Sequence, residues 1–303
     1  MRLYLVAAGL LGLSVTCLGP GSSWLAAARW TSRAPRAAVV LWQAIGVTGA
    51  VAAIGAGLAV AVVRFGVGFR AGLGDLAAGL VDGHPLSGLG LPDALGLTLA
   101  ADVAIVLATV VAITMVRTVR ARARHRRVLD LVGIGSEEAA GALLLDHPKA
   151  TAYCLPGIRP RIVVSAGALR LLHSSELAAV IEHERGHACE HHGLVMLPLT
   201  SLVEPLRWIP YARLAPTAVG LLLEMAADDY SARQHDRHDL ARALVRMGTA
   251  MAAPECAFAA AGISVPARVQ RLLTEDTTSR AAATAAVCSA SVLLLAPFAA
   301  LLA

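Results

Sequence analysis

Charged residues are scarce in this sequence, and its cysteines form no pattern. Only 16% of the 303 residues are charged, whereas 57% are hydrophobic, and the mean hydropathy is +0.66. A soluble domain usually carries about 25% charged residues, so this composition excludes an ordinary soluble globular protein. The five cysteines are dispersed and include no CxxC pair. They therefore predict no disulfide framework and are consistent with reduced thiols in the cytoplasm.

The apolar residues are concentrated in four blocks. The blocks run from Leu3 to about Ala28, from Ala37 to Val63, from about Ala94 to Val116, and from Ala281 to Ala303. Each is long enough to cross a hydrocarbon core, which needs roughly 20 apolar residues, and their frequent Gly and Ala suit close helix packing in lipid. The sequence predicts an integral membrane protein with about four transmembrane helices in a lipid bilayer. We interpret the first block as an uncleaved span, not a signal peptide.

The distribution of arginine predicts how these spans are oriented. Arg29, Arg33 and Arg36 follow the first block, and six arginines crowd into the eleven residues 117–127 after the third. Positive charge tends to stay in the cytoplasm, so we expect the N-terminus and the loop Arg64–Asp93 outside. The arginine cluster should attract anionic lipid headgroups. Because no aromatic residues interleave it, we expect no direct nucleic-acid binding. The prediction is a multi-pass plasma-membrane protein.

The segment between Arg127 and Arg280 has ordinary polarity and is long enough for one small domain. We therefore divide the chain into three membrane helices with their loops (1–127), a cytoplasmic domain (128–280) and a last membrane helix (281–303). The fold class expected is mainly α, a polytopic membrane protein with a small cytoplasmic α+β domain of zincin-like type. The predicted elements of that domain are a helix over Asp130–Leu145, strands over Ala150–Leu155 and Arg159–Ser165, a helix from Ser174 or Ser175 to Gly193, and helices over Ala218–Arg233 and Leu240–Ala253.

An apolar stretch inside the domain, Leu194–Leu223, is interrupted by four prolines. We expect it to dip into the membrane surface, with Trp208 and Tyr211 at the interface, and not to add a fifth and sixth span.

The pentad His183-Glu184-Arg185-Gly186-His187 lies in a predicted helix. Residues four apart lie one turn apart on the same helical face, so the two imidazoles can bind one metal ion. Glu184 beside them can act as a general base on a water molecule. This HExxH pattern is typical of zinc hydrolases. Chance would produce such a pentad in about one chain in a hundred of this kind, so its context has to support it.

A catalytic zinc typically takes three protein ligands. The pattern that supplies a third histidine would place it at position 193, which is Gly193. The better candidate is Glu224, with Asp228 one turn further on the same helical face. One carboxylate can bind zinc while Asp228 accepts the free N–H of a ligating imidazole. The alternative is that both carboxylates form a solvated helix face.

Other histidines are left open by the sequence. His191 and His192, at the expected end of the helix, are most simply a solvated terminus, although His191 can also lie near the metal. The group that would stabilise an oxyanion is not determined; the candidates are His173, His235, His238, Tyr230 and Arg233.

With this pentad, Glu224-x-x-x-Asp228 and a cytoplasmic domain between the third and fourth spans, the sequence resembles the BlaR/MecR-type antirepressor zinc metallopeptidases (gluzincins). The resemblance covers most of the chain and is shared in part with HtpX-type and CAAX-protease-type membrane peptidases. It implies His183, His187 and Glu224 as zinc ligands, Glu184 as general base, and a small DNA-binding repressor as the protein substrate. The beta-lactam sensors of that family carry an external penicillin-binding domain after the fourth span. This chain stops at Ala303, so direct antibiotic sensing is not expected.

The function expected is zinc-dependent cleavage of a cytoplasmic protein substrate, in the signal-dependent inactivation of a transcriptional repressor. Two alternatives remain. One is HtpX-like quality control of membrane proteins, and the other is a non-catalytic membrane sensor or scaffold. The strand Arg161–Ser165 has two open interpretations: a free edge to which an extended substrate can add, or an ordinary buried strand.

Overall fold

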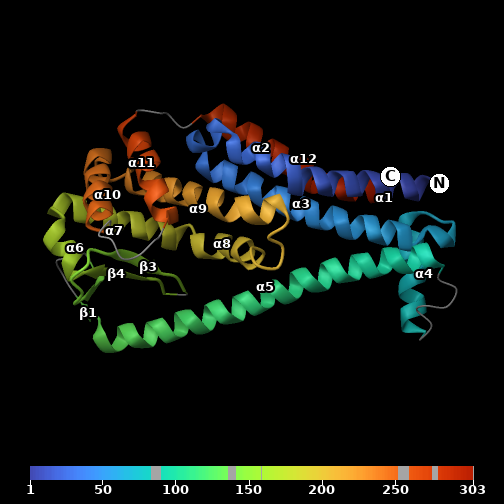
Figure 1. The fold of residues 1–303 in the computed structure, drawn as a ribbon, viewed down its shortest axis with the longest axis horizontal. Helices are drawn as coiled ribbons and strands as arrows, with labels where there is room; N and C mark the ends of the chain where they lie inside the picture. Colours follow the sequence, from blue (N-terminus) through green and yellow to red (C-terminus); the bar gives the residue numbers. More distant parts are fainter. Residues whose placement is uncertain (83–89, 136–140, 158, 252–258, 275–278, 303) are drawn as a thin grey trace.

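The protein is mainly helical, with one small sheet at one end (Figure 1). The computed structural model describes residues 1–82, 90–135, 141–157, 159–251, 259–274 and 279–302. The elements are α1 (Arg2–Thr16), a π-helical turn η1 (Cys17–Gly21), α2 (Ser22–Ala27), a 3-10 turn η2 (Arg29–Arg33), α3 (Pro35–Ala61), η3 (Val63–Phe65), α4 (Phe69–Val81), α5 (Leu91–Val132), β1 (Ile134–Gly135), β2 (Leu143–Leu145), β3 (Ala152–Leu155), β4 (Arg161–Ser165), α6 (Ala166–Leu171), α7 (Ser174–Cys189), α8 (His192–Ser201), α9 (Pro210–Ser231), α10 (Arg237–Met251), α11 (Ala259–Leu273) and α12 (Arg280–Leu302).

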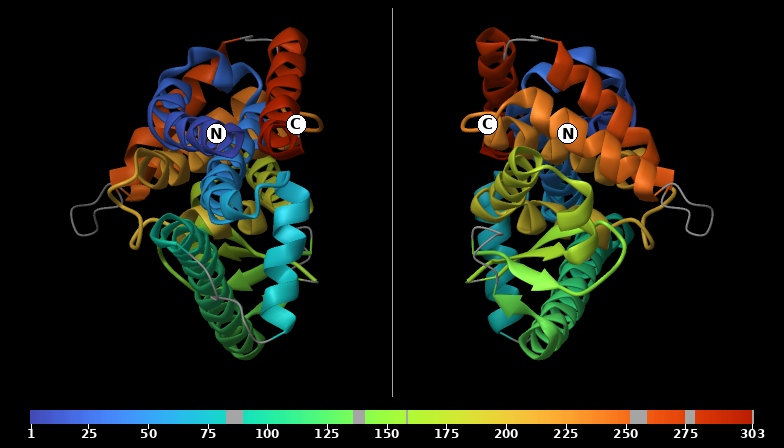
Figure 2. Two further views of the ribbon diagram at one scale, coloured as in Figure 1. Left: turned by 90° about the vertical axis from the view of Figure 1, so that its right-hand side faces the viewer. Right: turned by 90° about the vertical axis from the view of Figure 1, so that its left-hand side faces the viewer.

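Among the described residues, four helical segments are long and apolar enough to cross a membrane. They are Arg2–Ala27, Pro35–Phe65, Leu91–Val132 and Arg280–Leu302, and each contains one of the four apolar blocks. Both chain termini and α4 lie at the same end of the molecule, opposite the sheet (Figures 1 and 2). The segment Arg64–Asp93, expected as a loop, contains helix α4; its residues 83–89 lie outside the described part of the chain.

Helix α3 is the centre of the apolar bundle, because α1, α5 and α12 all pack against it. Small residues allow the closest of these approaches. A Cβ on Gly57 would lie 2.6 Å from the carbonyl oxygen of Gly96 and 3.0 Å from the Cβ of Ala100. Backbones that approach this closely gain dispersion contacts without any help from the hydrophobic effect. From this crossing α5 diverges towards β1 and leaves its surface largely exposed (Figure 1).

The sheet has four strands in the order β1-β2-β4-β3. Strands β3 and β4 are antiparallel, as the turn Pro156-Gly157 predicts, whereas β2 and β4 are parallel. The helix predicted over Asp130–Leu145 is wrong: α5 continues to Val132, and strands β1 and β2 follow it. Because β2 pairs with β4, the segment Arg161–Ser165 is an internal strand and not a free edge. The edge is β3.

Helix α7 begins at Ser174, within the expected range, but its N-cap is His173 and neither of the two serines that were expected to cap it. Glu176 accepts a hydrogen bond from the backbone N–H of His173, which satisfies one of the free donors at the helix start. The predicted end at Gly193 is wrong. The helix ends at Cys189, and the chain turns at His191, whose φ of 53° is left-handed. Gly193 lies inside the next helix, α8.

The stretch Leu194–Leu223 forms most of helix α8, a turn over residues 202–209 and the first part of α9, and both helices pack along the apolar bundle. Tyr211 of α9 is buried against Trp42 of α3 and donates a hydrogen bond to its carbonyl oxygen. Tyr211 is therefore a packing residue and does not lie at an interface, whereas Trp208 is 75% exposed. No further candidate span occurs among the described residues, in line with the four spans expected.

A second core, separate from the bundle, joins the sheet to α6, α7, α10 and α11. Its buried residues include Val164, Ala168, Ile181, Leu240 and Leu272. Helix α10 covers most of the predicted helix Leu240–Ala253, whose last two residues lie outside the described part. This core holds α7 between β3 and α9, which is the position of the candidate site (Figure 1).

Candidate metal centre

Helices α7 and α9 bring together three side chains that can hold a metal ion: His183, His187 and Glu224. One ligand atom from each lies within 4.8 Å of the other two. The Nε2 atoms of the two imidazoles are 3.2 Å apart, and carboxylate oxygens of Glu224 lie 3.5 Å from His183 Nε2 and 3.4 Å from His187 Nε2. Two imidazole nitrogens and one carboxylate are the donor set of many catalytic zinc sites. The residues therefore fit a zinc ion.

Close contact between α7 and α9 makes this arrangement possible. A Cβ on Gly186, inside the pentad, would lie 3.0 Å from the Cβ of Tyr230 and 3.3 Å from the Cα of Ala227. Any larger residue at position 186 would push the two helices apart. Glu224 would then move away from the imidazoles, because they lie on opposite helices.

His183 is supported from within the domain. It is 6% exposed, and its Nδ1 lies 3.0 Å from a carboxylate oxygen of Asp228, itself 1% exposed. Asp228 thus occupies the place expected of a residue that orients a ligating imidazole. It is a buried group and not part of a solvated helix face.

Arg268 of α11 completes this side of the site, and sequence reasoning missed it. Its Nε and Nη2 donate to the two carboxylate oxygens of Asp228 at 2.9 and 2.6 Å, and its Nη1 lies 2.7 Å from Glu224 Oε2. A guanidinium that is only 5% exposed needs such partners. Although burial opposes ionisation, Arg268 holds the pKa of Asp228 well below its usual range. Burial would also raise the pKa of Glu224, but contact with His183 and Arg268 lowers it to about 2.

His187 is supported from the other direction, through a chain of polar contacts that also escaped the sequence analysis. Its Nδ1 lies 2.8 Å from Nδ1 of His192, whose Nε2 lies 3.2 Å from Glu190 Oε2. Arg36, at the start of α3, donates from Nε and Nη2 to Glu190 at 3.0 and 2.6 Å. His192 is 4% exposed, so the expectation of a solvated terminus is wrong for it. The left-handed turn at His191 directs the chain so that His192 faces back to the site.

The two imidazoles consequently differ in basicity. Burial alone would lower the pKa of His183, but contact with Asp228 and Glu224 raises it to about 9. Burial lowers the pKa of His187 to about 4, against the opposing effect of Glu224. His187 is therefore neutral at physiological pH and can accept a metal ion directly. A metal bound to His183 would displace a proton, as is usual when imidazoles become ligands.

Glu184 lies between the ligand cluster and the sheet edge. Burial raises its pKa, while the charge of His183 and a hydrogen bond from the backbone of Cys154 in β3 act in the opposite direction. A carboxylate with a raised pKa suits a general base that works near neutral pH. The contact with Cys154 also places the edge strand β3 directly beside Glu184.

The C-terminal half of α5 borders the same edge strand. His125 Nε2 lies 2.8 Å from the hydroxyl of Tyr153 in β3, and Arg126 donates to the carbonyl oxygens of Pro156 and Arg159 at 3.3 and 2.9 Å. Arg122 donates at 3.4 Å to the carbonyl oxygen of Gly193, at the start of α8. Part of the arginine cluster therefore binds the peptide backbone of the domain.

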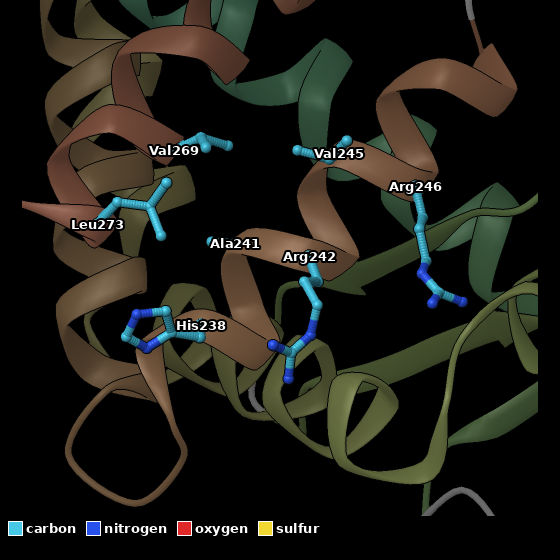
Figure 3. Close-up of a pocket in the computed structure, with 7 residues that line it drawn as sticks. All are labelled: His238, Ala241, Arg242, Val245, Arg246, Val269 and Leu273. Atoms are coloured by element: carbon cyan, nitrogen blue, oxygen red, sulfur yellow. The ribbon is translucent and has the colours of Figure 1, made fainter.

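The five open candidates for an oxyanion group lie outside the three-residue cluster. His173 precedes α7, His235 follows α9, and Arg233 stacks over the ring of Tyr230. His238 is exposed and lines a groove between α10 and α11 (Figure 3). None of the seven residues that line this groove belongs to the metal cluster. Among described side chains, Arg268 is the cation in contact with a proposed ligand carboxylate.

Part of this site lies in a segment that is similar to a known family. Residues 117–221 match the model of Peptidase family M48. The matched range contains β1 to β4, the HExxH helix and the first half of α9, and it ends shortly before Glu224. The match supports a zinc metallopeptidase of the M48 type. Searches of the curated proteins and of the solved structures returned no match.

Proposed function

We propose that the protein is a membrane-embedded zinc metalloendopeptidase that cleaves cytoplasmic protein substrates. The observation that carries this proposal is the meeting of His183, His187 and Glu224 within 4.8 Å beside Glu184. The four apolar helices support a membrane location. The arginines at the ends of the first and third spans support a cytoplasmic site, because cytoplasmic loops are rich in Lys and Arg.

In this mechanism His183, His187 and Glu224 would hold a zinc ion, and Asp228 fixes the orientation of His183. Zinc bound there would lower the pKa of a water ligand towards 7 and polarise the scissile carbonyl. Glu184 takes the proton from the attacking water and later passes it to the leaving amine. Burial of Glu184 raises the pKa of its carboxyl group, which strengthens it as the base that takes the proton from the water.

Substrate binding is assigned to the free edge of β3. This strand pairs on one side with β4 and ends the sheet on the other, next to Glu184. An extended peptide can add there through its backbone N–H and C=O groups. The mode of binding proposed for Arg161–Ser165 is thus moved to Ala152–Leu155.

The biological substrate is proposed to be a small DNA-binding repressor, on the resemblance to antirepressor peptidases. The acidic motif Glu224-x-x-x-Asp228 also resembles that of HtpX-type quality-control peptidases, which leaves a broader set of membrane-protein substrates as the second candidate. The two differ in how many proteins the site captures, and substrate trapping distinguishes them.

The test is capture of substrate by a Glu184→Gln variant. This variant should keep zinc and hold uncleaved substrate, which mass spectrometry then identifies: one DNA-binding protein for the first candidate, many membrane proteins for the second. Glu182→Gln is a matched control on the same helix, because Glu182 faces Arg185 and Gln234 and not the ligand cluster. Full proteolysis by the Glu184→Gln variant would remove the assigned role. Absence of zinc from the purified wild-type protein would instead favour a non-catalytic sensor or scaffold.

A further inference from the structure

The turn between α8 and α9, residues 202–209, is exposed although the two helices that it joins are packed. We call this turn the hairpin tip. Glu204, Pro205 and Arg207 are exposed, and Trp208 is 75% exposed. An indole ring that faces water gives up the large apolar burial that tryptophan normally provides. The hairpin tip therefore has a surface that a partner with an apolar part should cover.

Contacts with α3 show how far along the bundle the hairpin reaches. Tyr211, which follows the tip, donates to the carbonyl oxygen of Trp42 at 3.2 Å. On the other arm, the carbonyl oxygen of Val195 accepts a hydrogen bond from Gln43 Nε2 at 3.0 Å. Trp42 and Gln43 lie about 10–12 Å along α3 from its first residue, at 1.5 Å per residue. Figure 1 shows α8 and α9 running from the sheet end of the molecule to lie beside α3, which is part of a candidate membrane span.

The same contacts place the hairpin tip near one boundary of the hydrocarbon core, on the side of the metal centre. The candidate span Pro35–Phe65 has 31 residues, whereas about 20 helical residues cross the hydrocarbon core. Counted back from Val63, the end of the second apolar block, about 20 residues reach Ala44. Tyr211 packs at this level, because Gly46 leaves room for its hydroxyl group.

The backbone of the tip limits how deep it can lie. Residues 202–209 form turns and not a regular helix. Irregular backbone that faces lipid is not tolerated in the hydrocarbon core, because no water satisfies its N–H and C=O groups there. The tip therefore fits the headgroup region, where water is available.

The side chains of the tip fit the same level of a bilayer. Tryptophan is enriched at membrane–water interfaces, where its ring contacts acyl chains and its N–H stays hydrated. Glu204 and Arg207 are the two charged residues of the tip and offset each other, and the long stem of Arg207 lets its guanidinium reach the headgroups. Because these charges cancel, we assign the attraction to the indole ring of Trp208 and not to headgroup charge.

We propose that the hairpin tip inserts into the membrane–water interface as a re-entrant element. Helix α8 leads the chain to the bilayer, Trp208 lies where the headgroups meet the acyl chains, and α9 leads the chain back to the metal centre. The partner that covers the exposed surface of the tip is the lipid that also surrounds the neighbouring span.

Insertion would hold both halves of the metal centre at a fixed distance from the bilayer. His192 begins α8 and lies 2.8 Å from His187, and Glu224 lies about 20 Å from Tyr211 along α9, at 1.5 Å per residue. The hairpin thus joins the HExxH helix to the third proposed ligand by way of the membrane surface. Insertion itself does not depend on the proposed peptidase activity.

The test is the quenching of Trp208 fluorescence by bromine atoms at known depths in the lipid. The full chain is reconstituted in vesicles of phosphatidylcholine. The emission of a Trp208→Phe variant is subtracted from that of the wild-type protein, so that the difference comes from Trp208. This emission should be lost in lipid brominated near the headgroup and largely kept in lipid brominated at the end of the acyl chain. Iodide in the water on both sides of the membrane should quench it only weakly.

A matched control moves the same fluorophore to the core around the sheet. His238 is exposed on α10, and His238→Trp in the Trp208→Phe background should give strong quenching by iodide and none by brominated lipid. Trp208 emission that behaves like this control would overturn the proposal, because the tip would then lie in water. Strongest quenching by the deepest bromine atoms would also overturn it, since the hairpin would then cross the core as two further spans. So would protection from both quenchers, because another protein chain would then cover the tip.

Discussion

The two imidazoles of the HExxH helix are held by different parts of the molecule. His183 is deeply buried and depends on Asp228 of α9 and Arg268 of α11, two helices that pack with the sheet-containing part of the chain. The side chain of His187 is 20% exposed and depends on His192 and Glu190, which lead to Arg36 of α3, one of the four candidate membrane spans. One ligand position is thus internal to the domain, and the other is connected to the bundle.

The difference suggests how a change in the membrane helices can reach the site. Groups that contact a ligating imidazole from behind fix its tautomer and its orientation. A shift of α3 would move Arg36 and then Glu190 and His192, while the pairing of Asp228 with Arg268 would stay in place. We therefore expect Asp228 and Arg268 to keep His183 in a fixed position. We expect the orientation of His187 to change when α3 moves.

The largest effect should come from Glu184, which belongs neither to the residues that hold His183 nor to those that hold His187. Replacing it by Gln should lower peptide hydrolysis about a thousandfold, as expected for loss of a general base, with zinc content unchanged. The measurement is cleavage of a reporter peptide together with metal analysis. A parallel loss of zinc would show that Glu184 also contributes to metal binding. The centre would then depend on Glu184 as well as on the residues behind His183 and those behind His187.

Removing the His183 support should have the next largest effect. Asp228→Ala should weaken zinc binding by about a hundredfold, the upper end of the effect seen when such partners are lost. It also leaves Arg268 with Glu224 as its one carboxylate partner among the described residues, so thermal stability should fall as well. Chelator competition and thermal unfolding measure the two effects. Asp228→Asn, which keeps the shape, should fall between the wild-type protein and Asp228→Ala; an Ala variant with normal zinc affinity would contradict the role.

Removing the His187 support should have a smaller effect. His192→Phe keeps a ring of similar size but deletes both polar contacts, and zinc binding should weaken by about tenfold, the lower end of the same range. The effect is smaller because His187 is partly exposed and water can replace the lost partner. His238→Phe, at an exposed position on α10, is the control. Equal losses in His192→Phe and Asp228→Ala would remove the asymmetry on which this comparison depends.

Which parts of the site could be predicted from the sequence depends on how far apart the interacting residues lie along the chain. The pentad and the pair Glu224 and Asp228 depend on helical periodicity within one turn, which is local, and so their shared faces were predicted. Arg268 lies 40 residues from Asp228, and Arg36 lies 154 residues from Glu190. Arginines are usually solvated, so nothing in their local sequence distinguished these two.

The sheet shows the same limit. Strand β2 has three residues and its apolar run Leu143–Leu145 fits a helix equally well, so the sequence favoured a helix over Asp130–Leu145. Without β2, the strand Arg161–Ser165 had no partner on its second side, and an edge position remained open for it. One missed short strand thereby moved the proposed substrate edge from β3 to β4. The early end of α7 was missed for a related reason: a left-handed His191 is not evident when Gly193 offers a more usual stop.

The smallest effect should come from Arg36, the last member of the chain behind His187. Arg36→Gln should lower zinc affinity and hydrolysis only about two- to threefold, because a partly exposed ion pair contributes little on its own. The Arg36→Gln variant is informative when its effect on zinc affinity is compared in the presence and absence of His192. If Arg36 acts through Glu190 and His192, the substitution should have no further effect in a His192→Phe background, since residues in one network are not additive. Arg124→Gln, an exposed arginine on α5, should be neutral in both backgrounds. Equal losses from Arg36→Gln with and without His192 would instead mean that Arg36 acts through its contacts with α9, which are the carbonyl oxygen of Ala226 at 2.8 Å and the carboxylate of Asp229 at 3.8 Å. Helix α3 would then reach the site through α9 and Glu224 and not through His187.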